Sequence, residues 1–482
     1  MDLLYLAPMN RVQTTSAICV VEPARVSVSP EAAVVSFSCA TDPAILESSL
    51  SGGGYDRFSI FACDPVEVFI AGPGECPFRA LARCIDRYPV VRKTHPEVPF
   101  AGGWIGFFLY EAGLTVERLQ PTTVQDVALP PARFCLYDAV AVFDHSADQW
   151  WLSAVDWPAP LADARPTVDT RLTALRRRLE AAGADPLPEL SPPTSSPCVA
   201  NMSRGDYLAK VERAKQYIEA GDIYQVNISQ RFTTRTHATA TDVYRSLRSV
   251  TPSSHAAFLR WDDTAILSAS PELFLDLRAG HVVTRPIKGT RPRIGDRAVD
   301  LRARRELQDS PKDRAELTMI VDLLRNDLGR VCSYGRVRVV DAGSIEEHPT
   351  VFHRVATIEG ELAPGRTWLD LLLATFPGGS ITGTPKIRAM QIIDELEPTA
   401  RGVYCGSIGW IGLDGSMSLN IAIRTMVQVR DRVHVYAGGA IVADSTPEGE
   451  YDETLTKAAG MLRALGCASP AAASALNKAV MG

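Results

Sequence analysis

The chain has 482 residues, 46% of them hydrophobic, which is enough to bury a large core in one large domain or two closely joined ones. A formal net charge of −6 and a pI near 5.8, without a long basic block, argue against a nucleic-acid-binding protein. The ten cysteines form no C-x-x-C pair, no apolar run is long enough to span a membrane, and the N-terminus lacks a signal-peptide pattern. We therefore expect a cytoplasmic protein with reduced thiols.

The first part of the chain is predicted to be rich in β-structure. Short apolar runs between Gly and Pro turns predict strands at Ala33–Cys39, Phe58–Phe61 and Ala139–Phe143, and a basic segment near Arg171–Ala182 predicts a helix. A stretch rich in Pro and Ser follows. The predicted organisation is a β-rich N-terminal region (1–185), a linker (186–200) and a second domain (201–468).

The second domain is predicted to alternate helices with paired strands. Helices are predicted at Ser203–Ala220, Pro311–Leu328, Thr384–Leu396 and Gly449–Leu465, and strands at Tyr224–Phe232, Gly406–Leu413, Asn420–Arg430 and Arg432–Ala437. The first of these strands has an apolar face and a polar face that includes Gln225, and the polar face is either solvent-facing or lines a site. This pattern favours an α+β fold over a doubly wound parallel sheet.

Two residues of this domain are candidates for catalysis. Lys288, in the segment RPIKGTRPR, lies where a strand is predicted to enter a tight loop, and a lysine kept partly neutral there can act as a covalent nucleophile. The alternative is an ordinary solvated loop lysine. Glu272 begins another apolar strand, where partial burial would raise its pKa and suit a general acid. Its alternative role is to cap a backbone amide.

Two acidic pairs share one spacing. Asp313 and Glu316 are three residues apart on one predicted helix, and Glu450 and Glu453 are three apart on another, so each helix presents two carboxylates in one direction. Converging carboxylates would suit Mg²⁺, although such pairs are also common on solvated faces. Lys457 is either an ion-pair partner of Glu453 or an anion-binding residue of the same site.

Glycine-rich turns suggest close approach of the backbone to a ligand. The segments FPGGSITGTPK and YAGGA match neither the P-loop nor the dinucleotide fingerprint, so ATP and NAD are not expected.

Together these segments resemble the chorismate-utilising enzymes, over about Tyr207 to Leu465. The matching segments are IYQVNISQRF, SPELFL, PIKGTRPR, KDRAELTMIVDLLRNDLGRV, FPGGSITGTPK, GSIGWIG, NIAIRT and YAGGAIVADSTPEGEYDETLTKA. In the N-terminal half, AILESS, GYDRFSIFACDP and FAGGWIGFFLYEAG are similar to the component I enzymes of the family. The resemblance implies two facing antiparallel β-sheets flanked by helices, with a β-rich N-terminal part.

Two positions separate the reactions within this family. Gln225 stands where isochorismate and salicylate synthases typically carry the lysine that activates water. Lys288 stands where anthranilate synthases usually have alanine and aminodeoxychorismate synthases usually have lysine. The resemblance therefore implies the aminodeoxychorismate synthase branch, whose component I converts chorismate and ammonia to 4-amino-4-deoxychorismate for 4-aminobenzoate and folate. The alternatives are an anthranilate synthase component I, which aminates C2 and releases pyruvate, and a non-catalytic regulatory homologue, which we would expect to have lost its acidic residues.

The resemblance also implies roles for individual residues. Mg²⁺ would be held mainly by Glu316 and Glu453, with Asp313 and Glu450 acting through water. Lys288 would attack C2 of chorismate while Glu272 protonates the departing C4 hydroxyl. The substrate-contacting positions would be Gln225, Gly289, Thr290, His353, Tyr404, Arg424, Gly438, Gly439, Ala440 and Lys457.

Two partners are implied as well. No cysteine lies in a G-x-C-x-G nucleophile turn, so a separate glutamine amidotransferase subunit is expected to supply ammonia, with contacts to the N-terminal region. A tryptophan pocket is also implied, in which tryptophan is either a feedback inhibitor or a structural component. Its residues would be Ser48, Tyr55, Asp56, Arg57, Phe58, Ser254, His255 and Ala256.

Overall fold

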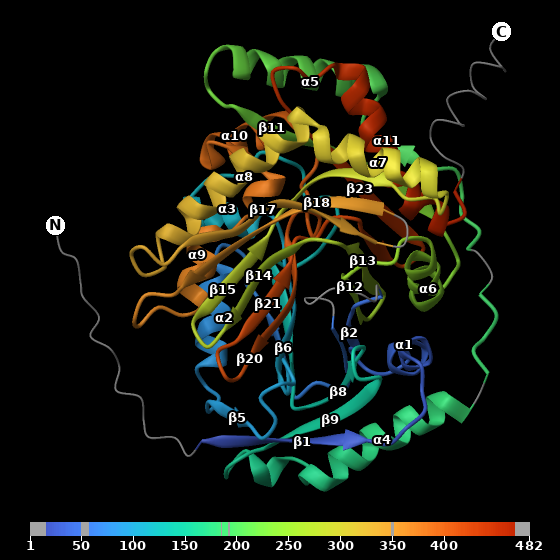
Figure 1. The fold of residues 1–482 in the computed structure, drawn as a ribbon. Helices are drawn as coiled ribbons and strands as arrows, with labels where there is room; N and C mark the ends of the chain where they lie inside the picture. The colour runs from blue at the N-terminus through green and yellow to red at the C-terminus, as the bar shows by residue number, and fades with distance from the viewer. Residues whose placement is uncertain (1–15, 50–56, 185, 191–192, 349–350, 468–482) are drawn as a thin grey trace.

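Two large β-sheets with helices on their outer faces organise the chain (Figure 1). The computed structural model describes residues 16–49, 57–184, 186–190, 193–348 and 351–467. Tyr55 and Asp56, two of the predicted tryptophan-pocket residues, lie outside these ranges.

The larger sheet combines strands from both halves of the chain, and its described part has thirteen strands. Their spatial order is β10 (Val199–Ala200), β11 (Gln225–Arg235), β23 (Arg432–Ile441), β22 (Thr425–Val429), β13 (Thr264–Ser270), β12 (His255–Trp261), β2 (Ala44–Glu47), β3 (Phe58–Ala62), β8 (Ala139–Asp144), β9 (Gln149–Asp156), β1 (Ala17–Ala24) and β5 (Val91–Lys93), with β19 (Gly383–Thr384) beside β11. The pair β1–β5 is parallel, so this sheet is mixed rather than antiparallel as predicted.

The second sheet is antiparallel throughout its described pairs and has ten described strands. Their order is β16 (Ile287–Pro292), β18 (Val351–Glu361), β15 (His281–Arg285), β14 (Leu273–Arg278), β21 (Met417–Asn420), β20 (Ser407–Gly412), β6 (Gly103–Phe108), β7 (Ala132–Tyr137) and β4 (Glu67–Ile70), with β17 (Arg338–Glu347) beside β18. Strands from before and after the predicted linker therefore share both sheets. The division into two domains stays a prediction.

The helices pack on the outside of the two sheets. They are α1 (Pro30–Ser38), α2 (Pro77–Ile85), α3 (Ala112–Glu117), α4 (Val168–Ala184), α5 (Arg204–Glu219), α6 (Ala240–Val250), α7 (Arg297–Asp309), α8 (Pro311–Gly329), α9 (Trp368–Thr375), α10 (Lys386–Leu396) and α11 (Pro447–Ala464), with short 3-10 helices η1 (Ala162–Ala164) and η2 (Gly379–Ile381). Figure 1 shows α5 and α11 together at one end, near β11 and β23, and α4 at the opposite end along β9 and β1. No described helix combines the length and the apolar character needed to cross a membrane.

One apolar cluster joins the two sheets face to face. It contains Ile60 and Ile266 of the larger sheet together with Phe107 and Trp410 of the second sheet, all at most 4% exposed. Burial of such side chains contributes roughly 1.5–3 kcal/mol each. The sheets are thereby fixed against each other, and the loops at their shared edge are held in place.

Most predicted helices agree with the structure to within a few residues, because their signals are local. Helix α5, for example, begins at the predicted Ser203 cap, where Ser203 and Asp206 form a reciprocal capping box. Helix α10 begins slightly later than predicted, because Gly383 and Thr384 pair with β11 and leave Pro385 as the N-cap.

Two predictions about strands are wrong. Ala33–Cys39 belongs to helix α1, because Ser29 caps the start through the Ala32 amide at 3.2 Å and Pro30 occupies the first turn. The predicted strand Asn420–Arg430 is two strands, β21 and β22, because the backbone at Arg424 is left-handed, with φ of 48°. A β-ladder cannot pass through that conformation.

A substitution at Gly106 of β6 would test how tightly the second sheet is packed. A Cβ at this position would lie 2.0 Å from the Arg133 carbonyl oxygen, whereas one at Gly329, at the end of α8, would meet no atom within 4 Å. We expect Gly106→Ala to lower the free energy of unfolding by about 1–3 kcal/mol through overpacking, and Gly329→Ala to leave it almost unchanged. Thermal melts of the two variants check this, and equal melting temperatures would contradict it.

Candidate functional site

Strand β16 presents Lys288 beside the carboxylates of helix α8. The next residue, Gly289, has a left-handed φ of 84°, and a Cβ there would lie 2.9 Å from the Asp313 carboxyl carbon. Only glycine lets the strand approach α8 this closely. Burial lowers the pKa of the half-buried Lys288; the nearby Lys457 ammonium adds to this effect, against the opposing influence of Glu316.

Glu272 lies immediately before β14 and is only 4% exposed. Burial raises its pKa to about 7, although a hydrogen bond from Ser380 and the charge of Lys288 both act in the opposite direction. A carboxylic acid with this pKa holds a proton near neutral pH and can also release it. The structure therefore places the two predicted catalytic residues close enough for each charge to shift the pKa of the other.

The four predicted metal-binding carboxylates come from α8 and α11. Their mutual electrostatic influence links Glu316 to both Asp313 and Glu453, and Glu450 to Glu453. Burial raises the pKa of Glu316 and of Glu450. Burial would also raise the pKa of Glu453, but the ammonium groups around it, Lys457 foremost, hold that pKa below its usual value.

The donor set is compatible with Mg²⁺ in chemical type, since all four side chains offer hard oxygen atoms. Glu450 Oε2 is buried and has no hydrogen-bond partner, while Oε1 accepts a hydrogen bond from Ser445 at 2.6 Å. The other three carboxylates form ion pairs with basic side chains. Glu453 pairs with Lys457 at 2.7 Å, Asp313 with Arg291 at 3.1 Å and Glu316 with Lys312 at 3.8 Å. Among the described residues, no three His, Cys, Asp or Glu side chains are grouped closely enough to hold a metal ion.

Arg424 is a cation without an anion. Its guanidinium makes no ion pair or hydrogen bond with any residue in the described ranges, and burial lowers its pKa. It also has a left-handed backbone, which costs a non-glycine residue about 1–3 kcal/mol. A desolvated, unpaired guanidinium in a strained conformation suits recognition of an anionic ligand.

His353 links this cation to the Lys288 loop. Its Nδ1 lies 2.9 Å from the Thr290 hydroxyl, and Thr290 is two residues from Lys288 on β16. Burial, then the charge of Arg424, lower the pKa of His353 well below its usual value, so the ring is neutral. A neutral ring can orient the Thr290 hydroxyl without adding a charge to the site.

The remaining predicted residues lie on β23 or contact it. Tyr404 stacks on Tyr436 of β23 with ring centroids 5.4 Å apart, and Lys457 donates a hydrogen bond to the Gly438 carbonyl at 2.9 Å. A Cβ at Gly439 would lie 2.8 Å from Glu450 Oε2. Ala440 pairs with Asn227 of β11.

Gln225 begins β11 and is fully buried, yet neither atom of its amide has a hydrogen-bond partner in the structure. The polar face of β11 is therefore buried rather than solvent-facing at this end, and the role of Gln225 in a site stays a prediction. No contact joins Gln225 directly to another of the predicted site residues within the described ranges.

Sequence reasoning missed Ser380 in η2. Its hydroxyl hydrogen-bonds Glu272, and its carbonyl accepts a hydrogen bond from the Asn227 amide at 3.0 Å. The only available signal was its place in the glycine-rich segment FPGGSITGTPK, which pointed to anion binding rather than to support of an acid.

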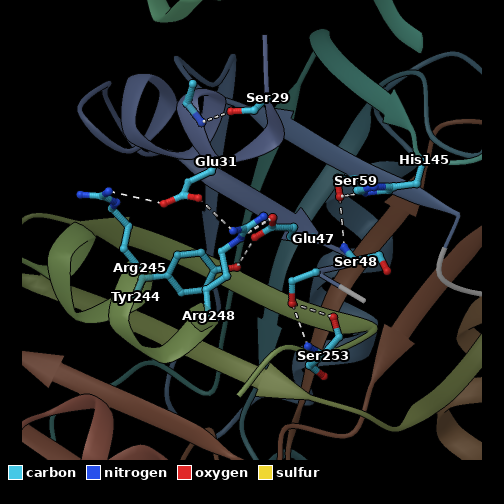
Figure 2. Close-up of polar contacts among 12 residues, drawn as sticks. Ser29, Glu31, Glu47, Ser48, Ser59, His145, Tyr244, Arg245, Arg248 and Ser253 are labelled. Carbon is cyan, nitrogen blue, oxygen red and sulfur yellow. Dashed lines mark hydrogen bonds and ion pairs between the residues drawn. The ribbon is translucent and has the colours of Figure 1, made fainter. Parts of the chain in front are cut away.

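The predicted tryptophan pocket coincides with a cavity of about 330 Å³ between the two sheets. Arg57, Phe58, Ser254, His255 and Ala256 all line it. Figure 2 shows the polar contacts beside it: the Ser48 amide donates to the Ser59 hydroxyl, which hydrogen-bonds His145 at 2.8 Å. Figure 2 also shows Glu47, a buried carboxylate of the cavity wall, paired with Arg248 at 2.7 Å.

One hydrogen bond links the cavity wall to the residue before Glu272. Ser254 donates a hydrogen bond to the Pro271 carbonyl at 3.4 Å, one residue before Glu272. Burial lowers the pKa of His255 in the cavity wall to about 4, so this residue is neutral.

Sequence comparison supplies the family. Residues 47–463 match the family described as chorismate binding enzyme. The chain belongs to the chorismate-binding enzymes. It is 39% identical to aminodeoxychorismate synthase component 1 of Salmonella typhimurium over 426 residues, covering 85% of this chain and 90% of that protein. It is also 40% identical to anthranilate synthase component 1 of Streptomyces coelicolor over 457 residues, covering 92% and 88%.

Solved structures confirm the fold of this chorismate-binding enzyme. Anthranilate synthase component I from Streptococcus pneumoniae superposes with a TM-score of 0.73 at 34% identity, covering 84% of this chain and 92% of that one. The menaquinone-specific isochorismate synthase of Escherichia coli shares the fold, with a TM-score of 0.71 at 17% identity over 94% and 95% of the two chains. The α+β fold with two sheets flanked by helices is thereby confirmed, with one sheet mixed.

Glu272 makes a testable contribution to stability. Because its pKa of about 7 in the folded protein exceeds the ordinary 4.5, its contribution is fully present below pH 4.5 and is lost as pH rises through 7. Glu272→Gln keeps the neutral shape. We therefore expect this variant to gain stability over the wild type between pH 5 and 8, by roughly 3 kcal/mol at most. Thermal melts across this range measure the difference, and a difference independent of pH would contradict the raised pKa.

Proposed function

We propose that the protein is an aminodeoxychorismate synthase component I, which converts chorismate and ammonia to 4-amino-4-deoxychorismate. The observation that carries the proposal is the pairing of Lys288, whose pKa is lowered by burial, with Glu272, whose pKa is raised to about 7. A neutral amine and a protonated carboxyl are the two forms that nucleophilic attack and departure of a hydroxyl require.

The proposed reaction has two steps. The neutral Lys288 amine bonds to C2 of chorismate, the two conjugated ring double bonds shift, and the C4–O bond breaks as Glu272 gives its proton to the departing hydroxyl, which leaves as water. Ammonia then bonds to C4, the two double bonds return, and the C2–N bond to Lys288 breaks. The new C4 ammonium gives up a proton, which restores the Glu272 acid. The enolpyruvyl ether remains, so a separate lyase would be needed to form 4-aminobenzoate.

Charged groups would bind the two carboxylates of chorismate. Arg424 would pair with the enolpyruvyl carboxylate, and the neutral His353 would hold Thr290 near it. Mg²⁺, held by Glu316 and Glu453 with Asp313 and Glu450 acting through water, would neutralise the ring carboxylate and withdraw electron density from the ring.

Two binding partners belong to the proposal. The relatives are named as component 1 of their synthases, which supports a separate amidotransferase subunit as the source of ammonia. Tryptophan would occupy the cavity between the sheets. Its ammonium and carboxylate groups would meet side chains of both charges. Arg57 forms an ion pair with Asp144 at 2.6 Å, and Arg278 forms one with Asp276 at 2.9 Å.

Anthranilate synthase component I is the second candidate, because the relatives of this chain include both enzymes at similar identity. The two candidates differ in the carbon that is aminated and in the fate of the pyruvyl group. They also differ in the need for Lys288, which would be dispensable for direct amination at C2.

The first experiment identifies the product. The purified chain is incubated with chorismate, Mg²⁺ and ammonium at alkaline pH, with and without an added aminodeoxychorismate lyase. We expect 4-aminobenzoate only when the lyase is present, and we expect Lys288→Ala to lose nearly all of this activity while Lys210→Ala, on α5, keeps it. Anthranilate and pyruvate without the lyase would support the second candidate, and full amination at C4 by Lys288→Ala would exclude Lys288 as the nucleophile.

A variant of Arg424 tests the anion site. Since the guanidinium has no partner to lose, we expect Arg424→Gln to melt at or above the wild-type temperature. The KM for chorismate should rise about 10- to 100-fold, the worth of a charge-assisted hydrogen bond. Arg430→Gln is the matched control: Arg430 also has a left-handed φ, of 55°, but its guanidinium is exposed. An unchanged KM in Arg424→Gln would remove this residue from the site.

A further inference from the structure

The turn that carries Tyr404 into the site is internally strained. Gly402 and Cys405 both have left-handed backbones, with φ of 62° and 63°, and the latter is not glycine. A non-glycine residue adopts this conformation only where the surroundings enforce it. The contacts that hold this turn are therefore as important to Tyr404 as its own packing.

Glu111 holds the start of the turn from a distant part of the chain. Its Oε1 accepts hydrogen bonds from the Arg401 amide at 2.8 Å and from the Gly402 amide at 3.3 Å, and Oε2 accepts from the Gly402 amide at 3.2 Å. The adjacent Tyr110 amide donates to the Gly402 carbonyl at 2.8 Å. Without the carboxylate, two backbone amides would lose their acceptor, a loss that buried amides rarely tolerate.

The carboxylate of Glu111 serves this turn and not its own helix. Glu111 is the N-cap residue of α3, but its side chain makes no capping hydrogen bond to the amides of that helix. Its carboxylate accepts hydrogen bonds from its own backbone amide and from the amides of Arg401 and Gly402, the former 290 residues away. Simple stabilisation of α3 does not explain that choice.

The other end of the turn is joined to the anion site. The Cys405 amide donates to the Ala422 carbonyl at 2.9 Å, two residues before Arg424. Tyr404 itself lies flat against Tyr436, with an angle of 11° between the rings. A shift of the turn would therefore move Tyr404 relative to β23 and loosen the support of Arg424.

We propose that Glu111 is a positioning residue, which fixes the 401–405 turn so that Tyr404 and Arg424 are correctly placed for the substrate. The proposal rests on the proposed function, since it assumes that these two residues contact chorismate. Glu111 would act through backbone hydrogen bonds and without touching substrate.

Kinetics of the full chain test the proposal. The variants are Glu111→Ala, which removes the acceptor, Glu111→Gln, which keeps one acceptor oxygen, and Glu117→Ala, which removes a carboxylate from the last turn of the same helix. Consumption of chorismate is measured with Mg²⁺ and ammonium, so that the result does not depend on which product forms. We expect Glu111→Ala to raise the KM about tenfold or more with a smaller change in kcat, Glu111→Gln to stay within about threefold of the wild type, and Glu117→Ala to match it.

Amide hydrogen exchange of a peptide spanning residues 399–406 provides a readout that needs no turnover. We expect faster exchange there in Glu111→Ala than in the wild type or in Glu111→Gln. Wild-type KM together with wild-type exchange in a folded Glu111→Ala would overturn the proposal, as would equal damage in the Ala and Gln variants.

Two further outcomes are separable. If Glu111→Ala does not fold, Glu111→Asp withdraws the carboxylate by one methylene, and unchanged KM and exchange in that variant would overturn the proposal. If the wild type consumes no chorismate, the proposed function is wrong, and the exchange measurement alone decides whether Glu111 tethers the turn.

Discussion

The geometry of the site depends on the hydrogen bonds of the buried Arg401 guanidinium. It is 2% exposed and pairs with Glu397 through two hydrogen bonds, at 2.7 and 2.9 Å. Its remaining N–H groups donate to the carbonyls of Ile381 and Asn227 at 2.9 and 2.8 Å. One side chain thus joins the end of α10, the η2 segment that carries Ser380, and strand β11. A buried charge is tolerable only with this degree of satisfaction, and lysine could not reproduce the planar fork.

The electrostatics of the site depend on burial more than on pairing. Burial is the largest influence on Lys288, Glu272 and Arg424, and in each case it favours the neutral form. Lys288 and Glu272 partly oppose this effect in each other. The pKa values of the two groups are nevertheless shifted toward each other, which reduces the free-energy cost of moving a proton between them. A solvated lysine and glutamate would both be charged and would lack this property.

Local signals explain what the sequence predicted well. Helix caps, alternating strands and glycine-rich turns depend on neighbouring residues, so α5, α8, β3 and β11 could be placed from the sequence. Helix α1 was missed because its apolar run resembles a strand, and only the Ser29 cap and Pro30 in the first turn favour a helix. Residue patterns singled out Lys288, Glu272 and the two acidic pairs, and their roles and the other candidate site residues came from a resemblance. The residues that support them could not be predicted from the sequence. Glu111 and Arg401 are 290 positions apart, and no local sequence pattern predicts their contact.

Three of the predicted substrate- and metal-binding residues have polar groups without a partner. Neither amide atom of Gln225 has a partner, Glu450 Oε2 has none, and Arg424 has no counter-ion within the described part of the chain. Each such group costs roughly 1–3 kcal/mol when it is buried. By contrast, the buried side chains of Arg401 and Glu397 are paired with each other. The unpaired groups include both an anionic and a cationic side chain, so a ligand that satisfied them would have to carry an anion for Arg424 and bring a cation to Glu450. A dicarboxylate that binds together with a divalent metal ion has that composition.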